Sequence, residues 1–204
     1  MKLFLSSSPD ISSEQLAELL QLVGKEKADK ALVITTAVVP CGLDLKPEWV
    51  NRAIEPLRAI TNEIDETSLE EGDLIPKDLS QYDFVFVTGG NVFYLACRLE
   101  ETGFGGLLRQ YVESGGVYAG SSAGSAILMS DLQHFATADD STKAPRLCEG
   151  LGILKEAIVF HANHEKYAPI MSDIAASYEQ DGLKVVKIND GEVLIVENKN
   201  KRFI

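Results

Sequence analysis

A Gly-x-Ser-x-Gly pattern places Ser122 between Gly120 and Gly124. A serine on a sharp turn from a strand into a helix projects its hydroxyl above the sheet, and the flanking glycines let the neighbouring backbone approach without a Cβ clash. Residues 117–119 have the composition of a short strand, and residues 123–129 are mostly good helix formers. The local context therefore fits such a turn, and Ser122 is the candidate nucleophile.

Two other serines stand beside the candidate nucleophile. Ser121 and Ser125 could also offer a hydroxyl, but neither occupies the central position of the pattern. The helix expected after Ser122 would begin at Ala123 and point its free N–H groups at developing negative charge. This arrangement is what nucleophilic attack on a carbonyl requires.

A glycine pair follows another apolar run, where Gly89 and Gly90 come directly after residues 84–87. Paired glycines let backbone N–H groups face a ligand, and one of these groups would complete an oxyanion hole with the N–H of Ala123. A plain tight turn and a phosphate-binding loop are the alternatives. The chain contains neither GxGxxG nor GxxxxGK[ST], so nucleotide binding has little support.

A general base is needed to activate a serine, and the chain has three histidines. His161 directly follows the apolar run 157–160, whereas His134 lies in a polar region. An imidazole titrates near neutrality, so it can accept the serine proton and later donate it to a leaving amine. His161 at a strand end is the favoured base, and His164 is the alternative.

A zinc site is a second interpretation of the same segment, because His161, His164 and Glu165 all carry ligand atoms. Their spacing is not HExxH, and no distant third ligand stands out. We therefore expect no metal and no other cofactor.

Composition places the chain among ordinary globular proteins. Its 204 residues are 45% apolar and 25% charged, and we expect one domain over residues 1–204. The net charge of −12 repels phosphate backbones and anionic lipid, so neither nucleic acid nor a membrane surface is an expected partner. The basic segment 199–202 is interpreted as a solubilising tail.

The three cysteines, Cys41, Cys97 and Cys148, lie far apart in the sequence. An odd and sparse cysteine count indicates reduced thiols in a cytoplasmic protein. The N-terminal apolar run is too short for a signal peptide, and no run approaches the length of a membrane span.

Strand-like and helix-like segments alternate along the chain, which predicts an α/β fold with a mostly parallel sheet between helix layers. The segments expected to be strands are 2–5, 31–35, 82–87, 117–119 and 157–160. The segments expected to be helices are 12–23, 48–60 with a kink or break at Pro56, 107–112, 123–129 and 169–178. Residues 183–188 and 192–197 flank Asn-Asp-Gly and predict a hairpin. In a parallel sheet, ligands bind at the carboxyl ends of the strands.

The combination of Gly89-Gly90-Asn91, the Gly-Ser-Ser-Ala-Gly turn at 120–124 and a strand ending in His161 resembles the peptidase E family. That family comprises aspartyl dipeptidases, with cyanophycinase as a relative. The resemblance covers residues 80–196 together with the opening strand-helix-strand. It implies a three-layer fold, in which helices flank a mostly parallel sheet, like that of class I glutamine amidotransferases and flavodoxin-like proteins. It does not imply the α/β-hydrolase fold.

The resemblance also implies roles for single residues. Ser122 would be the nucleophile and His161 the general base, and the Gly90 and Ala123 N–H groups would form the oxyanion hole. The triad acid would be Asp190, which precedes a glycine on the way into the last strands. It would accept the second imidazole N–H, fix the tautomer and stabilise the imidazolium.

The triad acid has alternatives. An older assignment within the family places the acid between the serine and the histidine, which would select Asp139 or Asp140. Those two aspartates lie in a polar loop, whereas Asp190 lies in an Asn-Asp-Gly segment that also fits a plain turn. We favour Asp190.

Substrate selection is where this chain departs from the family pattern. An enzyme that selects an N-terminal aspartate needs a cation, and relatives carry an arginine shortly after the histidine. Here no arginine occurs between His161 and Arg202. Asn91, His164 and Lys166 are the expected substrate-binding residues, although a lysine is a poorer bidentate partner for a carboxylate.

The sequence therefore predicts a serine peptidase that hydrolyses small peptides, including aspartyl peptides, through a Ser-His-Asp triad and an acyl-enzyme. An esterase using the same serine is one alternative, and a non-catalytic, amidotransferase-like binding module is another. Comparing the hydrolysis of an amide and an ester of the same acid distinguishes a peptidase from an esterase. Labelling by a fluorophosphonate distinguishes an activated serine from the inert serine of a binding module. The oligomeric state stays open, a homodimer included.

Overall fold

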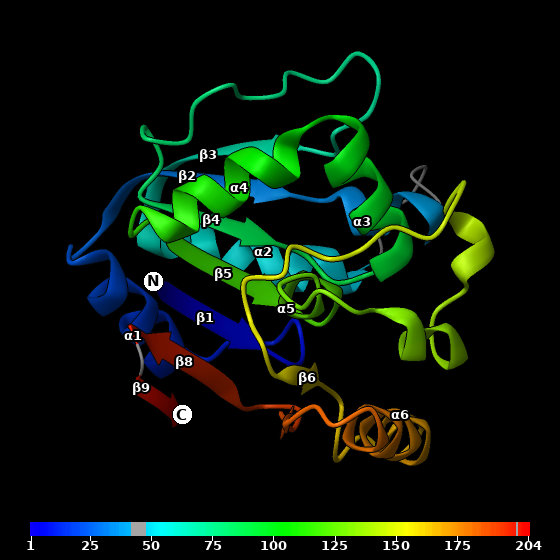
Figure 1. The fold of residues 1–204 in the computed structure, drawn as a ribbon. Coiled ribbons are helices and arrows are strands. Elements are labelled where there is room, and N and C mark those ends of the chain that lie inside the picture. The colour runs from blue at the N-terminus through cyan, green and yellow to red at the C-terminus, as the bar shows by residue number, and fades with distance from the viewer. Residues whose placement is uncertain (42–47, 199) are drawn as a thin grey trace.

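The computed structural model describes residues 1–41, 48–198 and 200–204. Within these residues the main sheet has seven strands in the order β3-β2-β4-β5-β1-β8-β9 (Figure 1). In that order the strands are β3 (Thr61–Thr67), β2 (Ala28–Ile34), β4 (Phe84–Val87), β5 (Val117–Ser121), β1 (Lys2–Ser6), β8 (Val193–Glu197) and β9 (Asn200–Phe203). The first five are parallel, and β8 and β9 are antiparallel to their neighbours. The predicted α/β class with a mostly parallel sheet is confirmed.

Helices cover both faces of this sheet. One face packs against α1 (Ser13–Val23) and α2 (Glu48–Ile60), and the other against α3 (Val92–Glu101), α4 (Phe104–Glu113) and the short α5 (Ala123–Ala126). In Figure 1, α4 lies in front of the sheet and α2 behind it. The central strands are buried on both faces, which explains their continuous apolar sequences.

A second, two-stranded parallel sheet joins β6 (Ala157–Val159) to β7 (Val185–Lys187). The helix α6 (Ala168–Gln180) connects these two strands and lies beside them at the lower right of Figure 1. Short 3₁₀ segments complete the described elements: η1 (Thr36–Cys41), η2 (Gln133–Thr137) and η3 (Ser141–Lys143). None of the described helices is long and apolar enough to cross a bilayer.

Local sequence explains where the helices begin and run. Ser12 caps α1 and forms a capping box with Gln15, so two terminal N–H groups are satisfied. The expected break at Pro56 does not occur, because α2 runs from Glu48 to Ile60 without interruption. A proline removes only one backbone hydrogen bond from a helix, and the buried apolar face of α2 holds the helix together.

Several elements differ from the sequence prediction. The sequence patterns do not predict β3 or α3, and α5 ends at Ala126 instead of Met129. The polar strand β3 lies at the edge of the sheet, where most of its side chains are half-buried or exposed. An edge strand needs no apolar run, so composition alone does not reveal it.

The predicted hairpin around Asn189-Asp190-Gly191 is wrong. The strand before it, β7, pairs with β6, whereas β8 pairs with β1 and β9. The backbone N–H of Ile188 donates to the Val159 carbonyl at 2.8 Å, which ties this end of the segment to the second sheet. Residues 189–191 therefore carry the chain from one sheet to the other.

The basic C-terminal segment is not a loose tail. Residues 200–203 form β9, where Lys201 pairs with Glu156 and Arg202 pairs with Glu18. Lys199, the first residue of the predicted tail, lies outside the described residues.

The prediction of three reduced cysteines is also wrong. Cys97 of α3 and Cys148 form a disulfide, and Cys41 alone is a free, exposed thiol. The two partners are 51 residues apart in the sequence but lie together between α3 and the segment before β6. Sequence spacing cannot reveal a pairing that depends on the packing of α3.

Reduction of this disulfide should lower stability. Closing a loop with a sequence separation of 51 residues restricts the unfolded chain, which corresponds to about 4 kcal/mol in the chain-entropy model. We expect thiol titration of the unreduced, denatured protein to count one thiol, and urea unfolding to shift to lower concentration with a phosphine reductant. Three reactive thiols without reductant would contradict the pairing.

Candidate active site

The carboxyl ends of three neighbouring strands meet at one edge of the sheet. β4, β5 and β1 are adjacent and parallel, so the turns that follow them lie side by side. These turns carry Gly89 and Gly90 after β4, Ser122 after β5, and Ser7 after β1. The candidate site is built at this edge, as expected for an open α/β sheet.

Ser122 is held in a strained backbone conformation with φ 49° and ψ −111°. Positive φ is rare for a residue with a side chain and costs about 1–3 kcal/mol. The flanking glycines are sterically required: a Cβ at Gly120 would lie 2.4 Å from the Gly124 carbonyl oxygen, and one at Gly124 would lie 2.1 Å from the Val87 carbonyl oxygen. The glycines thus permit the close turn that lifts the Ser122 hydroxyl from the sheet.

The neighbouring serines are both buried. Ser121 is buried at the end of β5. The buried Ser125 hydroxyl bonds to the carbonyl oxygens of Ser6 at 3.0 Å and Gly120 at 2.9 Å. Of these three serines, only Ser122 presents its hydroxyl to a histidine.

His161 provides that histidine. Its Nε2 lies 3.2 Å from the Ser122 Oγ, and its Nδ1 lies 2.6 Å from an Asp190 carboxylate oxygen. With the Nδ1 proton donated to Asp190, Nε2 is free to accept the proton of Ser122. His161 also has positive φ, 54°, and follows β6 of the small sheet, whereas we had expected the end of a strand in the main sheet.

Asp190 lies in the segment that crosses between the two sheets. Its carboxylate accepts hydrogen bonds from His161 and from the Ser7 hydroxyl, the latter at 2.7 Å, and its backbone N–H donates to the Asn163 side chain at 2.7 Å. These contacts fix the position of the carboxylate beside the imidazole. Asp190 therefore has a defined position and does not sit in a freely exposed turn.

Ser7 is a site residue that the sequence analysis missed. Its hydroxyl accepts a hydrogen bond from the His161 backbone N–H at 2.7 Å while it donates to Asp190. The fully buried hydroxyl thus fixes both the histidine backbone and the acid. The only signal in the sequence was a serine directly after a strand, and its meaning depends on β1 lying next to β5.

The expected oxyanion donors, the backbone N–H groups of Gly90 and Ala123, belong to the two turns that meet at Ser122. Neither the Gly90 nor the Ala123 N–H donates to any acceptor among the described residues. Gly90 has φ 132°, and a Cβ there would lie 2.2 Å from the Ala37 carbonyl oxygen. A Cβ at Gly89 would lie 3.2 Å from that of Ser122, which shows how closely the glycine pair approaches the nucleophile.

The loop before β6 brings two further aspartates toward this edge. Asp139 is half-buried, and its Oδ2 accepts the Val92 backbone N–H at 2.9 Å. Burial raises the pKa of Asp139, while the Val92 N–H and the charge of a protonated His161 oppose that rise. The Asp140 side chain instead bonds to Thr142 in solvent. Neither aspartate hydrogen bonds to the His161 ring, which contacts Asp190 instead.

Asn91 supports the glycine turn from within. Its side-chain oxygen caps α3 by accepting the Tyr94 N–H at 2.9 Å, and its amide donates to the Asp140 carbonyl at 2.9 Å. Both polar ends of the side chain therefore have protein partners. Contact between Asn91 and a substrate stays a prediction.

The segment after His161 supplies aromatic and basic side chains. The Tyr167 ring lies 5.6 Å from the His161 ring and 4.7 Å from the His164 ring, measured between centroids. Lys166 extends its ammonium over the Tyr167 ring at 5.1 Å. His164 and Lys166 thus border the site, and their contact with a substrate stays a prediction.

Metal-ligating residues gather elsewhere in the described part of the chain. Asp131, His134 and Asp181 bring their ligand atoms within 4.8 Å of one another, and His134 bonds to Asp181 at 2.6 Å. The segment with His161 and His164 does not form such a group with Glu165 among the described residues. The His161 ring nitrogens are engaged by Ser122 and Asp190 instead.

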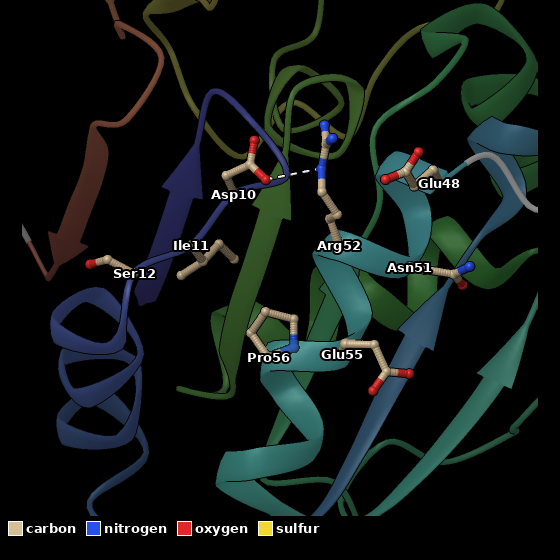
Figure 2. Close-up of a pocket in the computed structure, with 8 residues that line it drawn as sticks. All are labelled: Asp10, Ile11, Ser12, Glu48, Asn51, Arg52, Glu55 and Pro56. Carbon is tan, nitrogen blue, oxygen red and sulfur yellow. Dashed lines mark ion pairs between the residues drawn. The ribbon is translucent and has the colours of Figure 1, made fainter.

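A groove of about 590 Å³ opens between α2 and the segment that leads into α1 (Figure 2). It is lined by Asp10, Ile11, Ser12, Glu48, Asn51, Arg52, Glu55 and Pro56. Asp10 and Arg52 form an ion pair across it at 3.0 Å, drawn as the dashed line in Figure 2. The groove contains none of the three residues of the Ser-His-Asp arrangement, so its walls are not the catalytic centre.

A strained serine at the carboxyl edge of a parallel sheet, beside a histidine that is bonded to a carboxylate, is typical of the class of serine hydrolases. Comparison with known proteins agrees with that class. The chain is 30% identical over 150 residues to an uncharacterized peptidase of Listeria innocua, covering 72% of this chain and 71% of the relative. It is 28% identical over 142 residues to an uncharacterized peptidase of Pasteurella multocida, covering 68% of each.

Solved structures show the same fold. A crystal structure from Listeria monocytogenes, provisionally assigned as a peptidase E protein, superposes with a TM-score of 0.80 at 21% identity, covering 100% of this chain and 97% of that one. A peptidase from an acI-B1 actinobacterium superposes with a TM-score of 0.66 at 16% identity, covering 100% and 86%.

Residues 3–204 match peptidase family S51. The chain belongs to this family and is a serine peptidase, which confirms the resemblance drawn from the glycine pair and the serine turn. A non-catalytic binding module is therefore set aside.

Replacing Ser7 should impair positioning of the histidine and acid. Ser7→Ala removes two hydrogen bonds around His161 and Asp190, and a bond to a charged group contributes about 1.5–3 kcal/mol. We expect kcat to fall about 10- to 100-fold with little change in KM. Ser8→Ala, a half-buried neighbour with no side-chain hydrogen bond among the described residues, is the matched control, and equal activity of the two variants would remove Ser7 from the site.

Proposed function

We propose that this chain hydrolyses small peptides through a triad of Ser122, His161 and Asp190. The observation that carries the proposal is the continuous contact from the Ser122 Oγ to His161 at 3.2 Å and from His161 to Asp190 at 2.6 Å. The unpartnered N–H groups of Gly90 and Ala123 support a matching oxyanion hole. No cofactor is required by this chemistry.

The proposed reaction begins when Ser122 attacks the peptide carbonyl and His161 Nε2 takes the serine proton. The Gly90 and Ala123 N–H groups bind the oxygen that becomes negative, and Asp190 stabilises the imidazolium. His161 then protonates the leaving amine, which releases the first product. Water, activated by the same histidine, hydrolyses the acyl-enzyme.

Selection of an aspartyl side chain is the least supported part of the proposal. Among described residues after His161, the only arginine is Arg202, which lies in β9 and pairs with Glu18. Lys166 and His164 are the positively charged or ionisable groups near the site that could meet a substrate carboxylate. A lysine offers a point charge without the planar fork of an arginine, so we propose broader activity on small peptides.

Removal of the nucleophile should abolish hydrolysis. We expect Ser122→Ala to lose about a million-fold in kcat on the best substrate from a dipeptide library, as is typical for loss of a triad serine. The wild-type enzyme, but not this variant, should react with a fluorophosphonate. Ser125→Ala is the control for labelling, and retained turnover by Ser122→Ala would contradict the assignment.

Matched substrates test the peptidase against the esterase alternative. A peptidase must protonate a poor amine leaving group, whereas an ester releases a better leaving group without that assistance. We expect wild-type enzyme to hydrolyse the amide and the ester of the same acid. Turnover of the ester alone would favour an esterase.

The acid is tested by Asp190→Asn. An asparagine keeps the shape but no longer enforces the productive imidazole tautomer, and in chymotrypsin-like enzymes such a change costs about 10⁴ in kcat. We expect a loss of that order with unchanged thermal unfolding. Asp140→Asn, which alters an exposed carboxylate that bonds to Thr142, should retain activity. Activity lost in Asp140→Asn and retained in Asp190→Asn would instead assign the triad acid to Asp140.

A further inference from the structure

The Asp139 carboxylate lies near His161 but has no role in the proposed triad. Its Oδ2 accepts the N–H of Val92, which lies two residues after the proposed oxyanion donor Gly90. Its Oδ1 has no hydrogen-bond partner among the described residues, and Asp139 forms no ion pair within them. One oxygen of the carboxylate is therefore available to a ligand.

The loop that carries Asp139 is firmly placed. The Asn91 amide holds the neighbouring Asp140 carbonyl at 2.9 Å, and the Cys97–Cys148 disulfide joins the same loop to α3 further along. These contacts bind the loop to the helix that begins beside the glycine pair. The Asp139 carboxylate is thus attached to the first residue of α3, two residues after Gly90.

The Asp139 carboxylate accepts one N–H at the start of α3 but forms no ion pair among the described residues. Asp139 interacts electrostatically with two ionisable groups, His161 and Cys41. No lysine or arginine forms an ion pair with it within the described residues. Burial raises the pKa of the Asp139 carboxyl group because it disfavours the ionised form. A bound cation would stabilise that ionised form. A carboxylate near a forming oxyanion would oppose that negative charge unless a cation joined it.

We propose that Asp139 binds the free α-ammonium group of the substrate residue whose carbonyl Ser122 attacks. This inference rests on the proposed triad and adds a reason for exopeptidase selectivity. The α-nitrogen is separated from the scissile carbonyl carbon by one atom, so a group next to the oxyanion hole is suitably located to meet it. An ammonium ion donates to the open oxygen and neutralises the charge that would oppose the oxyanion.

The proposal predicts opposite effects on two substrates. The first is the best dipeptide from a library screen, and the second is the same dipeptide with its amino terminus acetylated. Asp139→Asn keeps an oxygen that accepts the Val92 N–H, so the loop contact survives while the charge is lost. We expect kcat/KM for the free dipeptide to fall about 10- to 100-fold, and that for the acetylated dipeptide to stay level or rise.

The matched control is Asp140→Asn, which removes the same charge from the next residue, whose side chain faces solvent. Asp140→Asn should leave the ratio of kcat/KM for the free dipeptide to kcat/KM for the acetylated dipeptide unchanged. An equal loss on both substrates in Asp139→Asn would indicate a structural role and overturn the proposal. An unchanged rate on the free dipeptide would overturn it as well.

Fluorophosphonate labelling separates this proposal from the one on which it rests. Asp139→Asn should label at Ser122 at the wild-type rate, because the reagent carries no ammonium group. Normal labelling with an unchanged substrate ratio would reject the Asp139 anchor and leave the triad standing. Retained hydrolysis by Ser122→Ala would reject the triad itself.

Discussion

The site depends on a backbone contact between two adjacent strand ends. Gly124, just after the nucleophile, approaches the Val87 carbonyl so closely that a Cβ would lie 2.1 Å from its oxygen. This approach presses the turn after β5 against the end of β4, and the strained φ of Ser122 is the consequence. The proposed nucleophile and the glycine pair are thereby packed directly against each other through the backbone.

The proposed base and the proposed acid, His161 and Asp190, reach this unit from outside the parallel sheet. His161 follows a strand of the small sheet, and Asp190 lies where the chain returns to the main sheet. Ser7, at the end of β1, bonds to both. The end of β1 therefore ties the His161–Asp190 pair, which belongs to the segments after β6 and β7, to the edge of the main sheet that carries Ser122.

The three aspartates of the region differ because their surroundings differ. Asp190 is held by a histidine and a serine, Asp140 bonds to Thr142 in solvent, and Asp139 is half-buried against the start of α3. Burial raises the pKa of Asp139. A carboxylate so placed favours binding a cation, whereas the Asp190 carboxylate already has its partners. The same residue type thus serves different chemistry according to its burial and its neighbours.

Much of the fold and the site could be predicted from the sequence. Apolar strands such as 84–87 and the Gly-x-Ser-x-Gly turn carry local signals, because strand burial and backbone crowding constrain residue type directly. The polar edge strand β3, the separate sheet of β6 and β7, and the Cys97–Cys148 pairing carry no such signal, since each depends on partners distant in sequence.

The residues themselves determined that a serine would stand on a strained turn at a strand end, with a glycine pair and a histidine as candidate partners. Only the tertiary structure decided that residues 189–191 cross between sheets instead of closing a hairpin, and that Ser7 joins Asp190 to His161. It also decided that one oxygen of Asp139 has no partner within the described residues. The physical reason is that strand order and loop packing set distances between groups remote in sequence, and local residue preferences do not encode those distances.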